Sequence, residues 1–316
     1  MSKSAKPAKQ PRPQVRFGIA EWYGRSFIHL SQAERSQYAE MQFRSDAVIP
    51  TCPFLSTSSK EVKCSKKGGV CSLRTYELST TGEAQLDGRG STVRTLCPAR
   101  FEEGSEIYRW IGEVVLGSNV AVPIGQINFL ERVPLIGAAD EGTTRLPEVG
   151  RIDNVLVIPG SDPLQWCPVE IQAVYFSGPN MQLEFKTILE YKGSGVPFPS
   201  RVRRPDYRSS APKRLMPQLQ IKVPDLSRWG KKMAVVVDQD FFNAMGKMET
   251  VTDLSNCDVV WFVVRYKEGE GRVRLVRGAH VYTKLQSAVD GLIAGRATAQ
   301  EKFEEKIRDK LKYRSP

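Results

Sequence analysis

Two carboxylates and an amide are spaced in a way that suits phosphodiester hydrolysis. Asp153 opens the apolar run NVLVI, and Glu170 lies seventeen residues later in the strand-like run PVEIQAVYFSG. Side chains alternate along a strand, so Glu170 and Gln172 face the same side. If the two runs are neighbouring strands, Asp153 and Glu170 can hold Mg²⁺, which prefers oxygen ligands and activates water for attack on phosphate.

Gln172 occupies the place where an Asp…Glu-x-Lys nuclease pattern has its lysine. A glutamine carries no charge, so it would orient water or phosphate through hydrogen bonds. An alternative remains open, because Asp…Glu-x-Gln also arises by chance in a partly exposed strand whose glutamate is solvated.

Four cysteines within 46 residues form a second candidate site: Cys52, Cys64, Cys71 and Cys97. Four thiolates can close a tetrahedral site around Zn²⁺ or iron, and this segment has few apolar residues with which to fold without a metal. The spacing lacks paired C-x-x-C motifs, so scattered buried thiols are the alternative. Cys167 and Cys257 lie in apolar runs and are predicted to be core residues.

A third group is basic and lies in the run GVPFPSRVRRPDYRSSAPKRL, which its prolines lead us to predict as a loop. Its candidate DNA-binding residues are Arg201, Arg203, Arg204, Arg208, Lys213 and Arg214. The alternative for any one of them is a solvated loop charge. Lys213 and Arg214, with Gln218 and Gln220 after them, are the residues we expect nearest to a DNA groove.

The remaining patterns predict the elements that position these groups. Apolar residues at helical spacing predict a helix in SEIYRWIGEVVLGS, and period-2 patterns predict strands in four runs, residues 119–133, 151–160, 168–178 and 182–193. A strand and helix (231–246), a hairpin (258–283) and helices (285–312) should follow. This mixture predicts an α/β (α+β) fold.

The composition favours a polyanionic partner. The 316 residues carry a formal charge of +11, which favours nucleic acid over a membrane, although a merely soluble basic protein is the alternative. We find no apolar run of about 18 residues and no export signal, so we expect a cytoplasmic protein, which the resemblance described below implies to be bacterial. We predict three parts: a flexible basic arm (1–15), a four-cysteine metal-binding domain (16–105) and a catalytic and DNA-binding domain (106–316).

Several short motifs together resemble the NotI-type restriction endonucleases. They are GIAEWYG, TCPFL, GGVCS, LCPAR and VEIQAVYFSG, with weaker similarity in KRLMPQLQIKV and WFVVRY. The resemblance spans about residues 16 to 275. It implies a PD-(D/E)XK nuclease core, with a mixed central sheet flanked by helices, and a small N-terminal domain with a four-cysteine metal site.

The resemblance also implies an activity and its residues. It implies a homodimeric, Mg²⁺-dependent type II enzyme that cuts both strands of a GC-rich palindrome, with a cognate DNA methyltransferase as genetic partner. Asp153 and Glu170 would bind the catalytic metal, and Gln172 would replace the usual lysine, as in that family. The four cysteines would hold iron rather than zinc. An Arg-rich loop suits a GC-rich site, because arginine donates two hydrogen bonds to guanine O6 and N7.

The family also has an acidic residue upstream of the aspartate. The segment GAADEGTTRLPEVGRID offers Asp140, Glu141 and Glu148, of which we predict Glu141. A different class of function stays open: a metal-stapled, sequence-specific DNA-binding protein without nuclease activity. The net charge, the cysteines and the arginines fit either function. The carboxylates favour the nuclease, because in a protein that only binds DNA they would repel the phosphate backbone. A thiol-based redox enzyme lacks the expected C-x-x-C motif.

Overall fold

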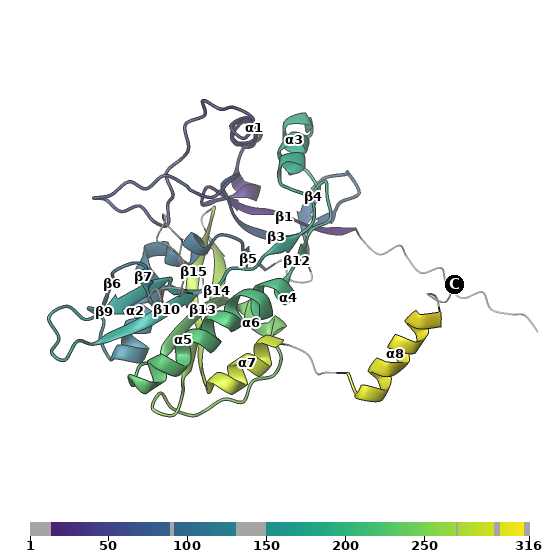
Figure 1. Ribbon diagram of the computed structural model, residues 1–316. Helices are drawn as coiled ribbons and strands as arrows, with labels where there is room; N and C mark the ends of the chain where they lie inside the picture. The colour runs from purple at the N-terminus through teal and green to yellow at the C-terminus, as the bar shows by residue number, and fades with distance from the viewer. Residues whose placement is uncertain (1–13, 89–91, 131–149, 270, 294–297, 313–316) are drawn as a thin grey trace, which may run out of the picture.

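The protein has a mixed α/β architecture with helices packed on a curled mixed sheet (Figure 1). The computed structural model describes residues 14–88, 92–130, 150–269, 271–293 and 298–312. Glu141, with Asp140 and Glu148, lies outside the described residues, as do most of the predicted basic arm and part of the strand predicted over 119–133.

In the described part of the chain, the larger sheet has six strands. Their spatial order is β15 (Arg272–Thr283), β14 (Val259–Gly269), β13 (Met233–Asp238), β10 (Trp166–Ile171), β9 (Asn154–Val157) and β6 (Val122–Pro123). β10, β13 and β14 run parallel to one another, whereas β15, β9 and β6 are each antiparallel to their neighbours. The predicted mixed central sheet is therefore confirmed.

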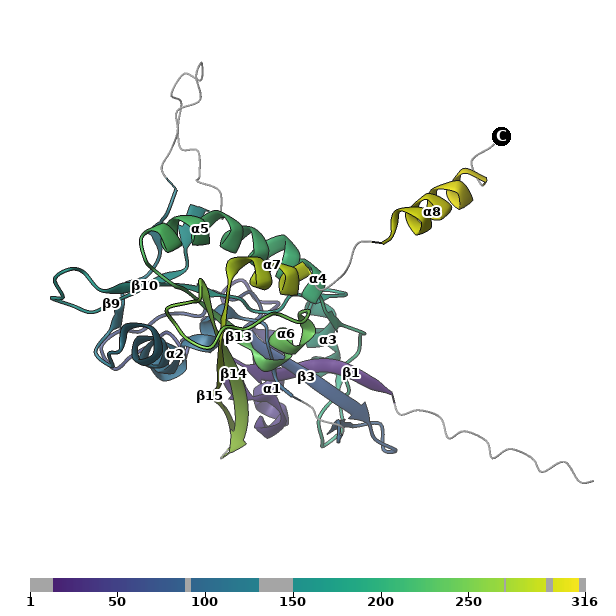
Figure 2. The same ribbon diagram turned by 90° about the horizontal axis from the view of Figure 1, so that it is seen from below.

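Both faces of this sheet are covered, and this explains the continuous apolar run in β13. Ala234 and Val236 pack on the side of α2 (Glu106–Ile111), whereas Val235 and Val237 pack on the side of α5 (Met216–Arg228) and α7 (Leu285–Ile293). Figure 2 shows α5 and α7 together on one side of the sheet and α2 on the other. A strand buried on both faces needs no polar alternation.

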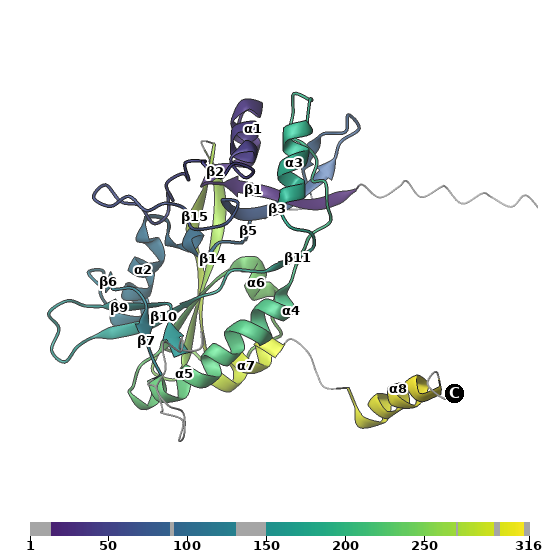
Figure 3. The ribbon, with the colours of Figure 1, turned by 45° about the horizontal axis from the view of Figure 1, so that its top comes forward.

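The N-terminal part forms a second sheet. Among the described residues it contains β2 (Arg25–Ser26), β1 (Val15–Trp22), β3 (Val70–Leu78) and β4 (Ala84–Leu86) in that order, with β5 (Arg94–Thr95) also paired to β3. Two helices, α1 (Gln32–Glu40) and α3 (Gln182–Glu190), lie side by side against it (Figure 3). Because α3 comes late in the chain, this core combines both predicted domains, and the boundary at residue 105 stays a prediction.

The strand predicted over residues 182–193 is wrong, because this segment forms the helix α3. Leu183, Phe185 and Leu189 fit a strand period, but Phe185, Ile188 and Leu189 also fit a helical one. Phe185 and Ile188 are buried in the N-terminal core, where Phe185 stacks on Trp22 with ring centroids 5.2 Å apart. Packing against that core selected the helical period.

The loop predicted over residues 195–215 is right only in its first half. Short strands β11 (Phe176–Ser177) and β12 (Arg204–Pro205) pair, and α4 (Tyr207–Ser210) then continues through a π-helical segment (Ala211–Leu215) into α5. Asp206 begins the helix because its side chain accepts a hydrogen bond from the Ser209 amide. The π-helical segment and α5 each have a proline in the first turn, where proline is tolerated.

Two predicted strands are only partly formed: the described part of 119–133 contains just β6 and β7 (Ile127–Asn128), and 168–178 is divided between β10 and β11. The elements after residue 230 and the helix after Ser105 are confirmed. α2 forms with its apolar side buried, β13 leads into α6 (Gln239–Ala244), and β14 and β15 form the hairpin. The last predicted region contains α7 and α8 (Gln300–Lys312); none of the residues of α8 is buried, and the ribbon views draw it apart from the sheets. Within the described ranges, no helix is long and apolar enough to cross a membrane.

Candidate active site

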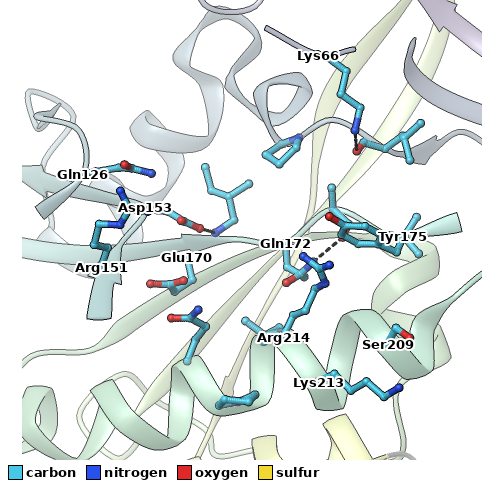
Figure 4. A pocket seen from close by; sticks show the side chains of 18 residues that line it. Lys66, Gln126, Arg151, Asp153, Glu170, Gln172, Tyr175, Ser209, Lys213 and Arg214 are labelled. Carbon is cyan, nitrogen blue, oxygen red and sulfur yellow. Dashed lines mark hydrogen bonds between the residues drawn. The ribbon is translucent and has the colours of Figure 1, made fainter. Parts of the chain in front are cut away.

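The two predicted carboxylates meet at the end of one strand pair. β9 and β10 are antiparallel neighbours, with Asn154 opposite Val169, so Asp153 and Glu170 are adjacent across the pair. Asp153 lies between β8 (Arg151–Ile152) and β9, and its Oδ2 accepts a hydrogen bond of 2.9 Å from the Ile171 amide. Figure 4 shows both carboxyl groups at the same cavity. The predicted neighbouring strands are confirmed.

Both carboxyl groups are poorly hydrated. Glu170 is only 4% exposed, and burial, reinforced by the negative charge of Asp153, raises its pKa to about 7. Burial also raises the pKa of Asp153. Two acids that water screens only weakly repel each other when ionised, so this place favours a nearby cation.

A lysine that we did not predict supplies one such cation. Lys222 on α5 is fully buried, and its Nζ donates to Glu170 Oε1 at 2.6 Å and also to the Arg151 carbonyl. The sequence carried a signal: Leu219, Lys222 and Val223 share the buried face of α5, a face on which lysine is rare.

A cavity of about 720 Å³ opens in front of the carboxylates (Figure 4). Its cationic lining residues come from three separate segments: Lys66, Arg151, and the adjacent pair Lys213 and Arg214. The Arg214 guanidinium lies over the Tyr175 ring, 3.7 Å from its centroid. A cavity lined by two carboxylates and four basic side chains can accept a phosphate together with a metal ion.

Three amides also line the cavity, and their oxygens matter for a metal. Gln172, on the same side as Glu170, donates from Nε2 to the Ala173 carbonyl at 2.5 Å. Gln126 and Gln218 line it as well, and Gln218 Oε1 is buried with no hydrogen-bond donor among the described residues. Mg²⁺ prefers oxygen ligands such as two carboxylates and an amide oxygen that accepts no hydrogen bond. These side chains therefore fit this ion.

A model of the restriction endonuclease NotI family matches residues 35–276, which is most of the chain. The chain belongs to this family. A search of curated proteins found no match. The NotI family consists of restriction endonucleases, so the protein is a site-specific deoxyribonuclease and DNA is its substrate. The matched region contains Asp153, Glu170 and Lys222, as well as the four clustered cysteines.

The predicted DNA-binding residues of this NotI-family chain divide into three groups. Lys213 and Arg214 line the cavity, whereas Arg201, Arg204 and Arg208 are exposed outside its lining. Arg203 differs from both: it is buried and pairs with Glu184 at 2.7 Å. We therefore leave Arg203 out of the DNA contacts proposed below, because its guanidinium already neutralises a buried acid.

One more acid near Asp153 was not predicted from the sequence. Glu102 accepts a hydrogen bond of 3.0 Å from the Tyr108 hydroxyl, which in turn accepts one of 2.8 Å from Asn154. Burial raises the pKa of Glu102, and the charge of Asp153 adds to this effect. The network ties the residue after Asp153 to α2 and so steadies the start of β9.

The four cysteines gather around the start of β3 in the N-terminal sheet. Cys52 and Cys71 are buried in one cluster with Cys64 packed against it, and the Cys97 amide donates to the Cys71 carbonyl at 3.0 Å. Within the described residues, however, no group of three or more His, Cys, Asp or Glu side chains is placed to hold a metal. The metal site stays a prediction. Cys167 and Cys257 are buried core residues, as predicted.

Proposed function

We propose that this NotI-family enzyme makes Mg²⁺-dependent double-strand cuts in a GC-rich palindromic DNA site. The observation that carries the proposal is the convergence of Asp153 and Glu170 in a cavity that basic residues also line. Such a cavity attracts the phosphate backbone, and the carboxylates would repel that backbone if they did not hold a metal. A PD-(D/E)XK core is the nuclease fold we infer from this arrangement.

The side chains divide the work. Asp153, Glu170 and the Gln218 oxygen would hold Mg²⁺, which supplies a water of lowered pKa and positive charge against the phosphate. Gln172 orients the water or a phosphate oxygen by hydrogen bonding, because it has no charge to contribute. Lys213 and Arg214 hold the backbone in register above the carboxylates.

The rest of the proposal concerns recognition and assembly. Exposed arginines of the preceding segment, Arg201, Arg204 and Arg208, are candidates for guanine contacts in the major groove. Two copies related by a twofold axis would read the two half-sites of a palindrome. Such an enzyme would act in the bacterial cytoplasm beside a methyltransferase that protects the host's own sites.

We also propose that Cys52, Cys64, Cys71 and Cys97 bind iron or zinc, with iron favoured by the family resemblance. Their gathering around the start of β3 supports this. So does Gly69, whose φ of +69° and contact with the Tyr23 ring allow only glycine in the turn before Cys71. Metal analysis of the purified protein tests it: one equivalent of metal is expected, and its loss in Cys71→Ser. Metal-free wild-type protein would refute this site.

The activity is tested with unmethylated, GC-rich plasmid DNA. Discrete fragments are expected from the wild type with Mg²⁺, none with EDTA, and none from Glu170→Ala. Mapping the fragment ends then gives the site. If neither protein cuts while both retard DNA in a gel, the proposed cleavage is wrong and the DNA-binding alternative gains.

A further inference from the structure

Lys222 connects the two segments that carry the candidate metal ligands. Its Nζ donates both to Glu170 Oε1, on β10, and to the Arg151 carbonyl, on β8. Arg151 is two residues before Asp153. One buried ammonium from α5 therefore contacts one acidic ligand directly and the backbone that leads to the other.

This connection lies just beyond the end of the β9–β10 ladder, where few backbone hydrogen bonds join the segments that carry Asp153 and Glu170. The β9–β10 ladder reaches from Trp166 to Val169 and ends opposite Asn154, one residue after Asp153. β8 belongs to a separate pair with β7 (Ile127–Asn128). Beyond the ladder, the Asp153 carboxylate receives the Ile171 amide. The Lys222 ammonium is thus a second tie between the two segments, from the helix side.

We propose that Lys222 is a positioning residue that aligns Asp153 and Glu170 to receive a divalent cation. It restores, from a helix, the positive charge that Gln172 does not provide on the strand. Lys222 does not line the cavity, so it acts through Glu170 and the β8 backbone rather than by touching DNA. This inference rests on the proposed function, since it assumes that the two carboxylates bind metal.

The geometry explains why a lysine suits this position. An ammonium has three donors on one nitrogen atom, so it can contact a carboxylate oxygen and a carbonyl oxygen at once. With Oε1 held by Lys222, the second oxygen of Glu170 is left for a cation. Partners that orient metal ligands typically contribute a factor of about 10 to 100 in metal affinity or activity.

The test compares Lys222→Met with Lys232→Met. Lys232 is a matched control because its Nζ donates to the carbonyls of Ser255 and Cys257, away from the cavity. Titration with Mn²⁺ alone, followed by calorimetry, should give about 10- to 100-fold weaker binding for Lys222→Met and wild-type binding for Lys232→Met. In the plasmid assay, Lys222→Met should lose kcat, whereas its affinity for DNA without metal should be unchanged.

Equal Mn²⁺ affinity in the two variants would overturn the inference, because a purely structural ion pair predicts loss of stability alone. The Mn²⁺ titration decides this even if the wild type does not cut DNA, so failure of the proposed function is recognised separately. If Lys222→Met does not fold, Lys222→Arg takes its place. Arginine keeps the charge, but its planar guanidinium is bulkier than an ammonium and cannot take the same position against both oxygens, so several-fold weaker Mn²⁺ binding is expected. Wild-type affinity in that variant would refute the proposed alignment.

Discussion

Arg214 is the side chain best prepared for a nucleic acid. It is exposed at the cavity, and the Tyr175 ring beneath it restricts its guanidinium to one plane. A guanidinium held in this way loses less conformational entropy when it contacts a phosphate or a base.

We predict that Arg214→Ala weakens DNA binding and lowers the slope of log Kd against log salt concentration by about one, as expected for one lost phosphate contact. Fluorescence anisotropy over a salt series measures both quantities. Arg228→Ala, which removes an exposed arginine paired with Asp225 at the far end of α5, is the control and should change neither. An unchanged slope in Arg214→Ala, with weaker binding to one sequence alone, would mean that Arg214 reads a base instead.

At the scale of the element, α3 ties a late part of the chain to the N-terminal sheet. Phe185 is 2% exposed and stacks on Trp22 with an interplanar angle of 13°. We predict that Phe185→Ala lowers the free energy of unfolding by about 3–5 kcal/mol, because it leaves a cavity between α3 and β1. Urea denaturation measures this loss. Leu183→Ala on the same helix is the control, since Leu183 is 41% exposed and should cost little.

The N-terminus of α1 gives a prediction about pH. Hydrogen bonds from the Ser31 amide, the Arg25 guanidinium and the Ser31 hydroxyl lower the pKa of Glu34 from 4.5 to about 2. A lowered pKa stabilises the folded state above pH 4.5, and this contribution disappears as the pH falls through 2. Glu34→Gln should therefore melt below the wild type at pH 6, with the difference vanishing toward pH 2.

Thermal melting by circular dichroism across this pH range checks the capping prediction. Glu40→Gln, at the other end of α1, is the matched control because it lies away from the capping box. A melting difference for Glu34→Gln that stays constant down to pH 2 would show that the carboxylate charge is not the cause.

At the scale of the whole molecule, one buried ion pair joins the two sheets. Arg100 and Glu21 are both fully buried, with Arg100 Nε 2.8 Å from Glu21 Oε2. Arg100 also donates to the Val273 carbonyl on β15 at 2.8 Å. The N-terminal sheet is thereby attached to the edge of the sheet that carries the active site.

We predict that Arg100→Met lowers the free energy of unfolding by about 3–5 kcal/mol, because it leaves Glu21 as an unpaired buried acid. Adding Glu21→Gln should recover part of this loss, since the double variant has no buried charge at this place. Urea denaturation of both single variants and the double variant measures the coupling. Strictly additive losses would show that the two side chains do not act as a pair.

Much of the fold was readable from the sequence because local patterns specify local structure. The hairpin over residues 258–283, the strand and helix after Lys232 and the buried face of α2 follow from the spacing of apolar residues. The proximity of Asp153 and Glu170 was also predictable, since a carboxylate next to an apolar strand is costly to bury and is rare unless it has a partner. Family membership follows from motifs spread over most of the chain.

Only the tertiary structure decided the rest, because those features depend on residues far apart in the chain. Residues 182–190 fit both periods, and the N-terminal core selected the helix. In the sequence Arg203 resembles the neighbouring exposed arginines, but in the folded protein it is buried and paired with Glu184. Lys222 comes 52 residues after Glu170, so no local spacing could link them. A sequence determines which side chains are present and how each segment prefers to fold, whereas burial and partners determine what a charge does.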